Sequence, residues 1–335
     1  MPCRTAGGTS LAFRANAGLA QDRAEWILGG ESAMVDRLAF HSVRGVRNKL
    51  WGPIRRMELM RPNLPDFSAP PVVEVALGVQ FEPLTGLRTV QVAVLWHAFR
   101  ERFPRTEEHQ PLEPMFERFG IGSPRHPEFM VQMLQALPVP RFWFLNGPGT
   151  ELIQVQQDRF IHNWRKVGDG DEYPRYEHLR DTFAREWSLF CPAVEKEGLG
   201  RPTANQCEIT YVNQIRSVGW ERHGQIGDVV TVFDPAYSDR FLGEPEDARL
   251  AVRYIIPGEN GEPAGRLHVQ IEPGVIQKDG QPMFHMVLTA RGSPIGEGVE
   301  GILRFLDLGR EWIVRSFASM TTSHMHQIWG RRDES

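Results

Sequence analysis

The clearest structural signal in the sequence is the stretch VEVALGVQF, which runs from Val73 to Phe81. Its valines, leucine and phenylalanine alternate with small or polar residues, and this period of two is typical of a β-strand that is buried on one face. The opposite face carries Glu74 and Gln80. The stretch therefore predicts a sheet with one apolar face, which packs into the core, and one polar face.

Further strands and helices are expected on the C-terminal side of this stretch. Short apolar runs bounded by Gly, Pro or Asn predict strands, and apolar stripes with a period near 3.6 residues predict helices. The expected helices span residues 88–102, 176–196 and 299–320, and the expected strands span residues 141–145, 152–155, 160–164, 207–212, 250–256, 267–271 and 283–290. Because short turns join most consecutive strands, this order predicts an α+β fold with a largely antiparallel sheet and helices packed on one face.

The predicted elements fall into two pseudo-similar halves. Residues 60–200 have the order β-α-β-β-β-α, and residues 201–335 contain a meander of strands closed by a helix. Val73–Gln80 and Cys207–Gln214 share Glu and Gln at the same offsets, which suggests a duplication. We expect the two halves to form one continuous domain.

Residues 1–59 are expected to lie outside this domain, because they are rich in Ala, Gly and Arg and lack a sustained periodicity. Residues 1–56 hold nine basic and four acidic residues, a balance of +5. Since the whole chain has a net charge of −4, the remainder carries −9. We interpret the leader as an appended or disordered basic segment, with translation starting at Met57 or Met60, and a basic targeting presequence is the alternative.

The composition argues against several classes of protein. The apolar stretches reach about ten residues, short of the roughly 20 that span a bilayer, and no signal peptide is recognisable, so we expect a cytoplasmic protein. Three cysteines without a C-x-x-C pair support neither a disulfide framework nor a cysteine zinc site. The acidic body disfavours nucleic acid as a partner, because non-specific binding to nucleic acid depends on clustered positive charge.

The motifs indicate no cofactor and no metal. The sequence contains no P-loop, no strand-anchored G-x-G-x-x-G, no H-E-x-x-H and no G-x-S-x-G. His324-Met325-His326 brings two imidazoles close together in the sequence, but a catalytic zinc site needs a third protein ligand. We therefore expect a polar C-terminal segment there.

The most suggestive polar residues lie in the predicted hairpin 154–166, which carries amide, guanidinium, imidazole and indole groups. We expect these groups to share the polar face of the sheet with the acids and amides of the strands that begin at Val73 and Cys207. Buried amides and carboxylates need partners, so such a face would form a specific polar site. The residues of this predicted site are Glu74, Gln80, Gln154, Gln156, His162, Trp164, Glu208 and Gln214.

Three other interpretations of these residues stay open. The hairpin could simply face water, with Trp164 covering an edge. The alternation of aromatic and basic residues is also found on platforms for single-stranded nucleic acid, although Arg159 belongs to an acidic body. Finally, Glu74 and Glu208 could face each other, which would raise the pKa of one carboxyl group and support acid/base chemistry.

Several separated motifs carry a resemblance to a known family. They are PPVVEV (Pro70–Val75), ELIQVQ (Glu151–Gln156), RFIHNWRK (Arg159–Lys166), NQCE (Asn205–Glu208) and MHQIWG (Met325–Gly330). In this order they resemble a sporadically distributed family of uncharacterised bacterial proteins, over about residues 60–332. The resemblance implies no particular activity. A patchy distribution is consistent with an accessory or defence-related role.

The leading hypothesis is a binding or interaction protein that holds a partner or a small polar ligand on the polar face. An enzyme of unrecognised type, such as a hydrolase that uses a carboxylate with a histidine, is the second hypothesis, and an obligate oligomer with a structural role is the third. Convergence of Glu74, Glu208 and His162 in one enclosed pocket would favour the enzyme. An open face ringed by apolar side chains would favour a partner surface.

Overall fold

The computed structural model describes residues 64–120, 139–216, 226–232, 241, 246–276 and 280–332. These residues belong to one compact unit, Glu58–Ser335. The predicted leader, residues 1–59, lies outside the described residues, which begin at Leu64.

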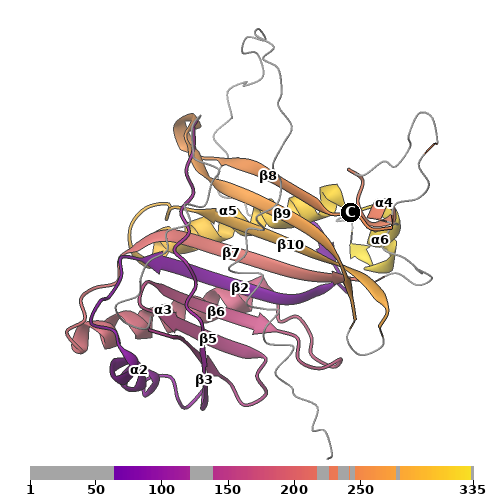
Figure 1. Cartoon of the computed structure of the whole chain (residues 1–335). Coiled ribbons are helices and arrows are strands. Elements are labelled where there is room, and N and C mark those ends of the chain that lie inside the picture. Colours follow the sequence, from indigo (N-terminus) through magenta and orange to yellow (C-terminus); the bar gives the residue numbers. More distant parts are fainter. Residues whose placement is uncertain are drawn as a thin grey trace, which may run out of the picture. The chain divides into compact units, whose positions relative to one another are not determined.

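Nine strands form one sheet in this part of the chain, and every neighbouring pair is antiparallel (Figure 1). β2 (Val72–Phe81) and β7 (Ala204–Ile215) lie side by side at its centre. Outward from β2 the order is β6 (Arg159–Arg165), β5 (Glu151–Gln156), β4 (Arg141–Leu145) and β3 (Arg105–His109). Outward from β7 the order is β10 (Pro282–Gly292), β9 (Pro263–Val275) and β8 (Leu250–Pro257).

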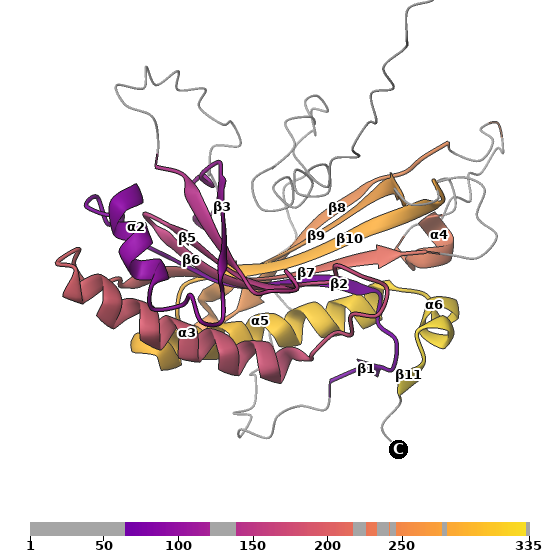
Figure 2. The same ribbon diagram turned by 90° about the horizontal axis from the view of Figure 1, so that it is seen from below.

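Two long helices, α3 (Tyr176–Lys196) and α5 (Gly298–Met320), cover one face of this sheet (Figure 2). The shorter elements are α2 (Thr89–Trp96), α4 (Ile226–Val229), α6 (Ser323–Ile328), a 3₁₀ turn η2 (Glu259–Gly261) and a small sheet of β1 (Asp66–Phe67) with β11 (Arg331–Arg332). The predicted α+β fold with an antiparallel sheet is confirmed. The predicted similarity of its two halves stays a prediction.

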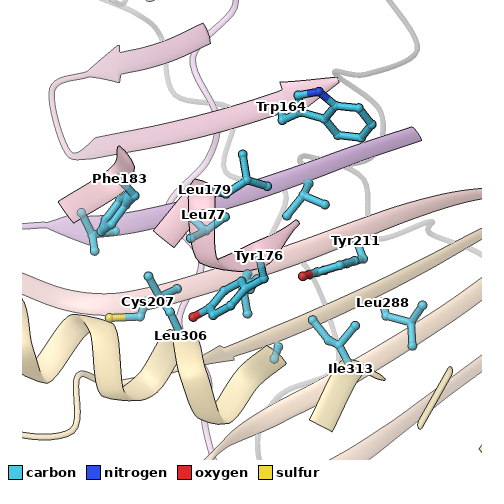
Figure 3. Packing of buried hydrophobic residues seen from close by; sticks show 14 of the residues in the cluster. Leu77, Trp164, Tyr176, Leu179, Phe183, Cys207, Tyr211, Leu288, Leu306 and Ile313 are labelled. Atoms are coloured by element: carbon cyan, nitrogen blue, oxygen red, sulfur yellow. The ribbon is translucent and has the colours of Figure 1, made fainter. Parts of the chain in front are cut away.

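The core lies between the sheet and these two helices. Val75, Leu77 and Val79 of β2 point toward the helices and are almost fully buried, as the alternation predicts. The helices supply the other side of the core through apolar stripes that include Phe183 of α3 and Leu306 of α5 (Figure 3). Burying each of these side chains contributes about 1.5–3 kcal/mol, so this layer accounts for much of the stability of the fold.

One region differs from the prediction. The predicted helix 88–102 is shorter than expected and ends as α2 at Trp96, after which turns lead to Pro104. The chain then forms β3, an edge strand that the sequence pattern does not predict. Residues 110–120, called the crossing segment below, follow β3 without regular secondary structure.

A glycine sets the distance between α5 and the sheet. A Cβ atom at Gly309 would lie 2.6 Å from Cγ2 of Ile209 and 3.1 Å from Cβ of Ala290. We expect Gly309→Ala to lower the free energy of unfolding by about 1–3 kcal/mol, because overpacking outweighs the gain of about 1 kcal/mol in helix propensity. Urea denaturation measures this change, with the exposed Ser319→Ala as the control on the same helix. A more stable Gly309→Ala variant would contradict the close packing.

Candidate functional site

The face of the sheet opposite α3 and α5 carries most of the predicted site, and we call it the polar face. Side chains directly opposite each other on neighbouring strands share a face. Gln156 pairs with Arg159, Arg159 with Gln80, and Gln80 with Gln206, so these four form one row across β5, β6, β2 and β7, which we call the glutamine row. By the same alternation Glu74, Gln154, Glu208 and Gln214 also lie on the polar face.

His162 and Trp164 lie on the opposite face, and the prediction that they belong to the same surface is wrong. His162 is opposite Leu77 and Trp164 is opposite Val75, so both point toward the helices. Both are buried. The physical reason is that β6 is buried on both faces, so its alternation of polar and aromatic residues does not separate an inner face from an outer one.

His162 has its own partner on the helix side. Its Nδ1 atom lies 2.8 Å from Oε2 of Glu186 of α3, within ion-pair distance but outside the angles of a hydrogen bond. The other oxygen of Glu186 accepts a hydrogen bond from Arg102 at 2.6 Å. The sheet thus separates His162 from Glu74 and Glu208, and the three groups on which the enzyme hypothesis depends do not converge.

Glu74 and Glu208 share the polar face but do not face each other. Glu208 is opposite Gly78, four residues along β2 from Glu74. At about 3.3 Å per residue this separates the two positions by about 13 Å. β2 and β7 run in opposite directions, so equal offsets in the two strands lie at opposite ends of the pair. For the same reason Gln80 lies opposite Gln206 and far from Gln214.

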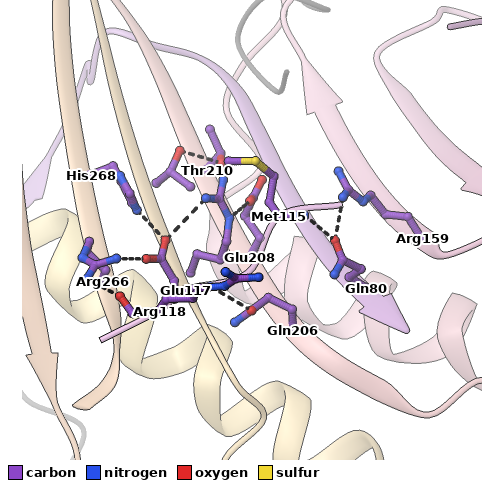
Figure 4. A network of polar contacts seen from close by, with 12 residues as sticks. Gln80, Met115, Glu117, Arg118, Arg159, Gln206, Glu208, Thr210, Arg266 and His268 are labelled. Atoms are coloured by element: carbon purple, nitrogen blue, oxygen red, sulfur yellow. Dashed lines mark hydrogen bonds and ion pairs between the residues drawn. The ribbon is translucent and has the colours of Figure 1, made fainter. Parts of the chain in front are cut away.

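The crossing segment lies along the glutamine row and is held through its main chain. Gln156 accepts a hydrogen bond from the N–H of Leu112 at 2.8 Å and donates one to its C=O at 2.7 Å. Gln80 accepts from the N–H of Met115 at 2.9 Å, as Figure 4 shows. These bonds place the segment across β5 and β2, roughly at right angles to the strands.

Further main-chain bonds continue the same pattern. Arg159 donates to the C=O of Glu113 at 2.8 Å and to the side chain of Gln80 at 2.7 Å. Gln206 accepts from the N–H of Glu117 at 3.3 Å. Arg266 of β9 donates to the C=O of Arg118 at 3.0 Å. Side chains from successive strands therefore recognise successive peptide groups of one extended segment.

The carboxylate of Glu117 is the charged anchor of the crossing segment (Figure 4). It forms an ion pair with Arg266, accepts a hydrogen bond from Nε2 of His268 at 2.6 Å, and lies 3.4 Å from Arg291. Burial alone would raise the pKa of Glu117, but His268, Arg291 and Arg266 together hold it below its usual value. Arg266 and His268 of β9 and Arg291 of β10 therefore form a binding site for a carboxylate.

A second series of hydrogen-bonded polar side chains crosses β4, β5, β6 and β2. Arg141 donates to Gln154 at 2.8 Å, Gln154 donates to Asn163 at 2.8 Å, and Asn163 donates to Glu74 at 2.7 Å. Burial raises the pKa of Glu74, although the bond from Asn163 and the charges of Arg165 and Arg141 act against this rise. Gln154 and Glu74 thus belong to a network whose members form hydrogen bonds with one another within the sheet.

The sequence prediction missed several residues of this site. Gln206, Arg266, His268, Arg291 and the crossing segment were not selected. The alternation of Arg266, Leu267, His268 and Val269, at the start of the predicted strand 267–271, was a readable signal for two of them. The crossing segment gave no such signal, because it binds through peptide groups rather than through a pattern of side chains.

Metal and thiol chemistry find no support in the described part of the chain. No group of three or more His, Cys, Asp or Glu side chains there has the arrangement of a metal site. His326 instead contacts Oγ1 of Thr321 through Nε2 at 2.8 Å and Arg331 through Nδ1 at 3.1 Å. Burial raises the pKa of the Cys191 thiol to about 12 and also raises that of Cys207, so neither thiol is activated as a nucleophile.

Comparisons with known proteins leave the family open. No family model matches the chain, and the search of curated proteins finds no match. The resemblance to a family of uncharacterised bacterial proteins stays a prediction. Within the described residues no helix is long and apolar enough to cross a membrane.

The depressed pKa of Glu117 predicts a loss of stability in acid. A carboxyl group whose pKa is lower in the folded state stabilises the fold at pH values above its ordinary pKa, and this contribution disappears as the pH falls through the folded value. We expect Glu117→Gln to lower the free energy of unfolding by about 2 kcal/mol at neutral pH. Urea denaturation at several pH values should show that the difference in free energy of unfolding between the variant and the wild type becomes smaller as the pH falls below 4.5, the ordinary pKa of a Glu side chain. A constant difference would contradict the charge-based role.

The raised pKa of Glu74 predicts a pH dependence of stability opposite to that of Glu117. Because its pKa is raised, the folded state favours the protonated carboxyl group, so its ionisation opposes folding increasingly as the pH rises above 4.5. The amide of a Glu74→Gln variant can still accept the hydrogen bond from Asn163. We therefore expect this variant to be more stable than the wild type at neutral pH and equally stable in acid. Thermal unfolding at several pH values measures this, and a variant less stable at neutral pH would show that the charged form is the one the fold needs.

Proposed function

We propose that the protein binds an extended polypeptide segment with an acidic side chain on the polar face of its sheet, in the place that the crossing segment occupies. The observation that supports this most strongly is the contact of Gln156 with both the N–H and the C=O of Leu112. This is how one side-chain amide recognises one extended residue. It depends on no particular side chain in the bound segment.

The specificity of the proposed site comes from its charged end. Arg266, His268 and Arg291 surround one carboxylate and leave it largely buried. Hydrogen bonds to charged groups contribute about 1.5–3 kcal/mol each, roughly twice as much as those between neutral groups. A partner segment with Asp or Glu at this position is therefore favoured over a neutral one.

The crossing segment is held weakly enough to be exchanged. Its main apolar anchor is Leu112, whose burial contributes about 1.5–3 kcal/mol, whereas Phe116 is 51% exposed. Each main-chain hydrogen bond adds only about 1 kcal/mol net, and ordering each backbone residue costs about 1–2 kcal/mol. Apart from the ion pairs of Glu117, these opposing terms are of similar size, so a segment that supplies its own carboxylate and fits better can compete.

The face also offers groups that the crossing segment does not use. Nε2 of Gln80 and Nε of Arg159 are buried and have no hydrogen-bond partner among the described residues. A buried donor without a partner costs about 1–3 kcal/mol. A partner whose C=O groups reach these two donors would gain this energy, which supports exchange over permanent occupation.

We place this binding in the cytoplasm of a bacterial cell, with an accessory or defence-related role. The cytoplasmic assignment is supported by the absence of a paired thiol among the described residues, where Cys191 and Cys207 are both free. A segment of another protein, rather than a nucleic acid, is the partner that a pocket for one carboxylate suits.

A peptide binding assay tests the proposal. The variant Leu112→Pro/Met115→Pro/Glu117→Ala removes the two main-chain N–H groups that donate to Gln156 and Gln80, together with the carboxylate that Arg266 and His268 bind, and so frees the face without changing its own side chains. We expect a fluorescent peptide with the sequence of residues 109–120 to bind this variant and not the wild type, as measured by fluorescence anisotropy. A peptide in which every residue except Leu112 and Glu117 is alanine should still bind, because recognition is through the main chain, one apolar side chain and one carboxylate.

Matched variants assign the binding to the glutamine row. In the freed background, Gln80→Ala with Gln206→Ala should weaken peptide binding by about tenfold or more, since each lost hydrogen bond contributes about 1 kcal/mol. Gln214→Ala, on the same strand but outside the contacts, is the control. The proposal fails if a folded, freed variant does not bind the native peptide, or if the alanine peptide does not bind at all.

A further inference from the structure

We propose that a cavity on the helix-covered side of the sheet binds a small apolar carboxylic acid. The cavity has a volume of about 330 Å³ and lies between β1, β11, the N-terminal end of α3 and the C-terminal half of α5. This volume is within the range of small-molecule sites. The cavity is on the opposite side of the sheet from the crossing segment, so the inference is independent of the proposed function.

The walls of the cavity are mostly apolar. Leu288 of β10 and Ile313 of α5 form part of them, and Figure 3 shows both side chains and Tyr211. Val72, Phe67 and Phe317 complete the apolar surface. Such walls favour the apolar body of a ligand, because its transfer from water is favourable in proportion to the area buried.

One end of the cavity carries two tyrosine hydroxyls. The hydroxyl oxygens of Tyr173 and Tyr211 are 2.9 Å apart. The pair has two hydrogens and its mutual bond uses one, so the other is available to an acceptor. Burial raises the pKa of Tyr211 to about 12 and raises that of Tyr173 well above its usual value, so both hydroxyls stay protonated and act as donors.

The charged groups of the lining favour a negative ligand. Three arginines line the cavity against two carboxylates, which leaves one positive charge in excess. Arg175 and Arg332 both contact Asp66, at 2.9 and 3.1 Å. Arg310 lies 4.7 Å from the ring centre of Tyr176 and 3.2 Å from the half-exposed Glu177. Arg310 is therefore the cation best placed to meet a carboxylate beside the tyrosines.

The backbone of Arg175, which lines the same cavity, is strained. Arg175 has φ 71° and ψ 156°, a region that only glycine adopts readily, and no other non-glycine residue in the described ranges has a positive φ. Its guanidinium holds Asp66 and the C=O of Phe67. Strain of this kind concentrates at functional sites, where the surrounding structure maintains it. The fold thus fixes an arginine at the wall of the cavity at a cost in stability.

Titration calorimetry with a matched pair of probes tests the inference. 2-Naphthoic acid and 2-naphthamide have the same apolar body, but only the acid carries a charge at neutral pH. We expect the full-length protein to bind the acid at least tenfold more tightly than the amide. No binding of the acid at millimolar concentration, or equal binding of the two probes, would overturn the proposal.

Variants connect the binding to the cavity. Arg310→Gln should weaken binding of the acid by about tenfold and leave the amide unchanged, whereas Arg315→Gln, on the exposed surface of α5, should change neither. Val314→Trp, at a half-buried position in the wall, should abolish binding of both probes. Circular dichroism confirms that each variant is folded. Equal effects of Arg310→Gln on acid and amide would contradict the assigned role of the charge.

Arg175→Gly distinguishes a binding role from a purely structural one. Glycine adopts the conformation of residue 175 without strain, so we expect the variant to be at least as stable as the wild type in thermal unfolding. We also expect it to bind 2-naphthoic acid several-fold more weakly, because the wall loses a cation. A large loss of stability with unchanged binding of the acid would show that Arg175 serves the fold alone.

Discussion

The antiparallel pairing of β2 with β7 is the constraint on which the rest of the structure depends. It places Leu77 opposite Ile209 on the helix side and Gly78 opposite Glu208 on the polar side. Each strand added outward keeps this alternation, because side chains that face each other across a pair lie on the same side of the sheet. One face thus becomes apolar enough to take two long helices, and the other collects polar groups from strands that are far apart in the sequence.

The same pairing decides which polar groups meet. Equal offsets in β2 and β7 suggest that Glu74 corresponds to Glu208 and Gln80 to Gln214, but the strands run in opposite directions. Gln80 therefore meets Gln206, and the glutamine row extends to Gln156. A sequence pattern shows which face a side chain takes, whereas the direction and register of the neighbouring strand determine its partner.

The fold was more predictable from the sequence than the site. The class of the fold, the central strand and the long helices were predictable, because periods of 2 and 3.6 residues are strong over Val73–Phe81, Tyr176–Lys196 and Gly298–Met320. His162 was misplaced because its carboxylate partner, Glu186, comes from α3, and nothing in the hairpin itself indicates a polar group on the core side. The crossing segment was unpredictable because main-chain hydrogen bonds leave no period in the side chains.

The polar face constrains what can occupy it. The amides of Gln80, Gln156 and Gln206 are buried, and an occupant that meets only one of them leaves part of the hydrogen-bonding capacity of the others unused, since Gln80 then keeps only its bond from Arg159 and Gln156 only its bond to Asp158. An extended polypeptide presents N–H and C=O groups at regular intervals along the whole row, and the crossing segment does this for all three. A small polar ligand is too short to do the same. The length of the row therefore favours a polypeptide partner over a small ligand, while the cavity on the other side of the sheet suits a compact molecule.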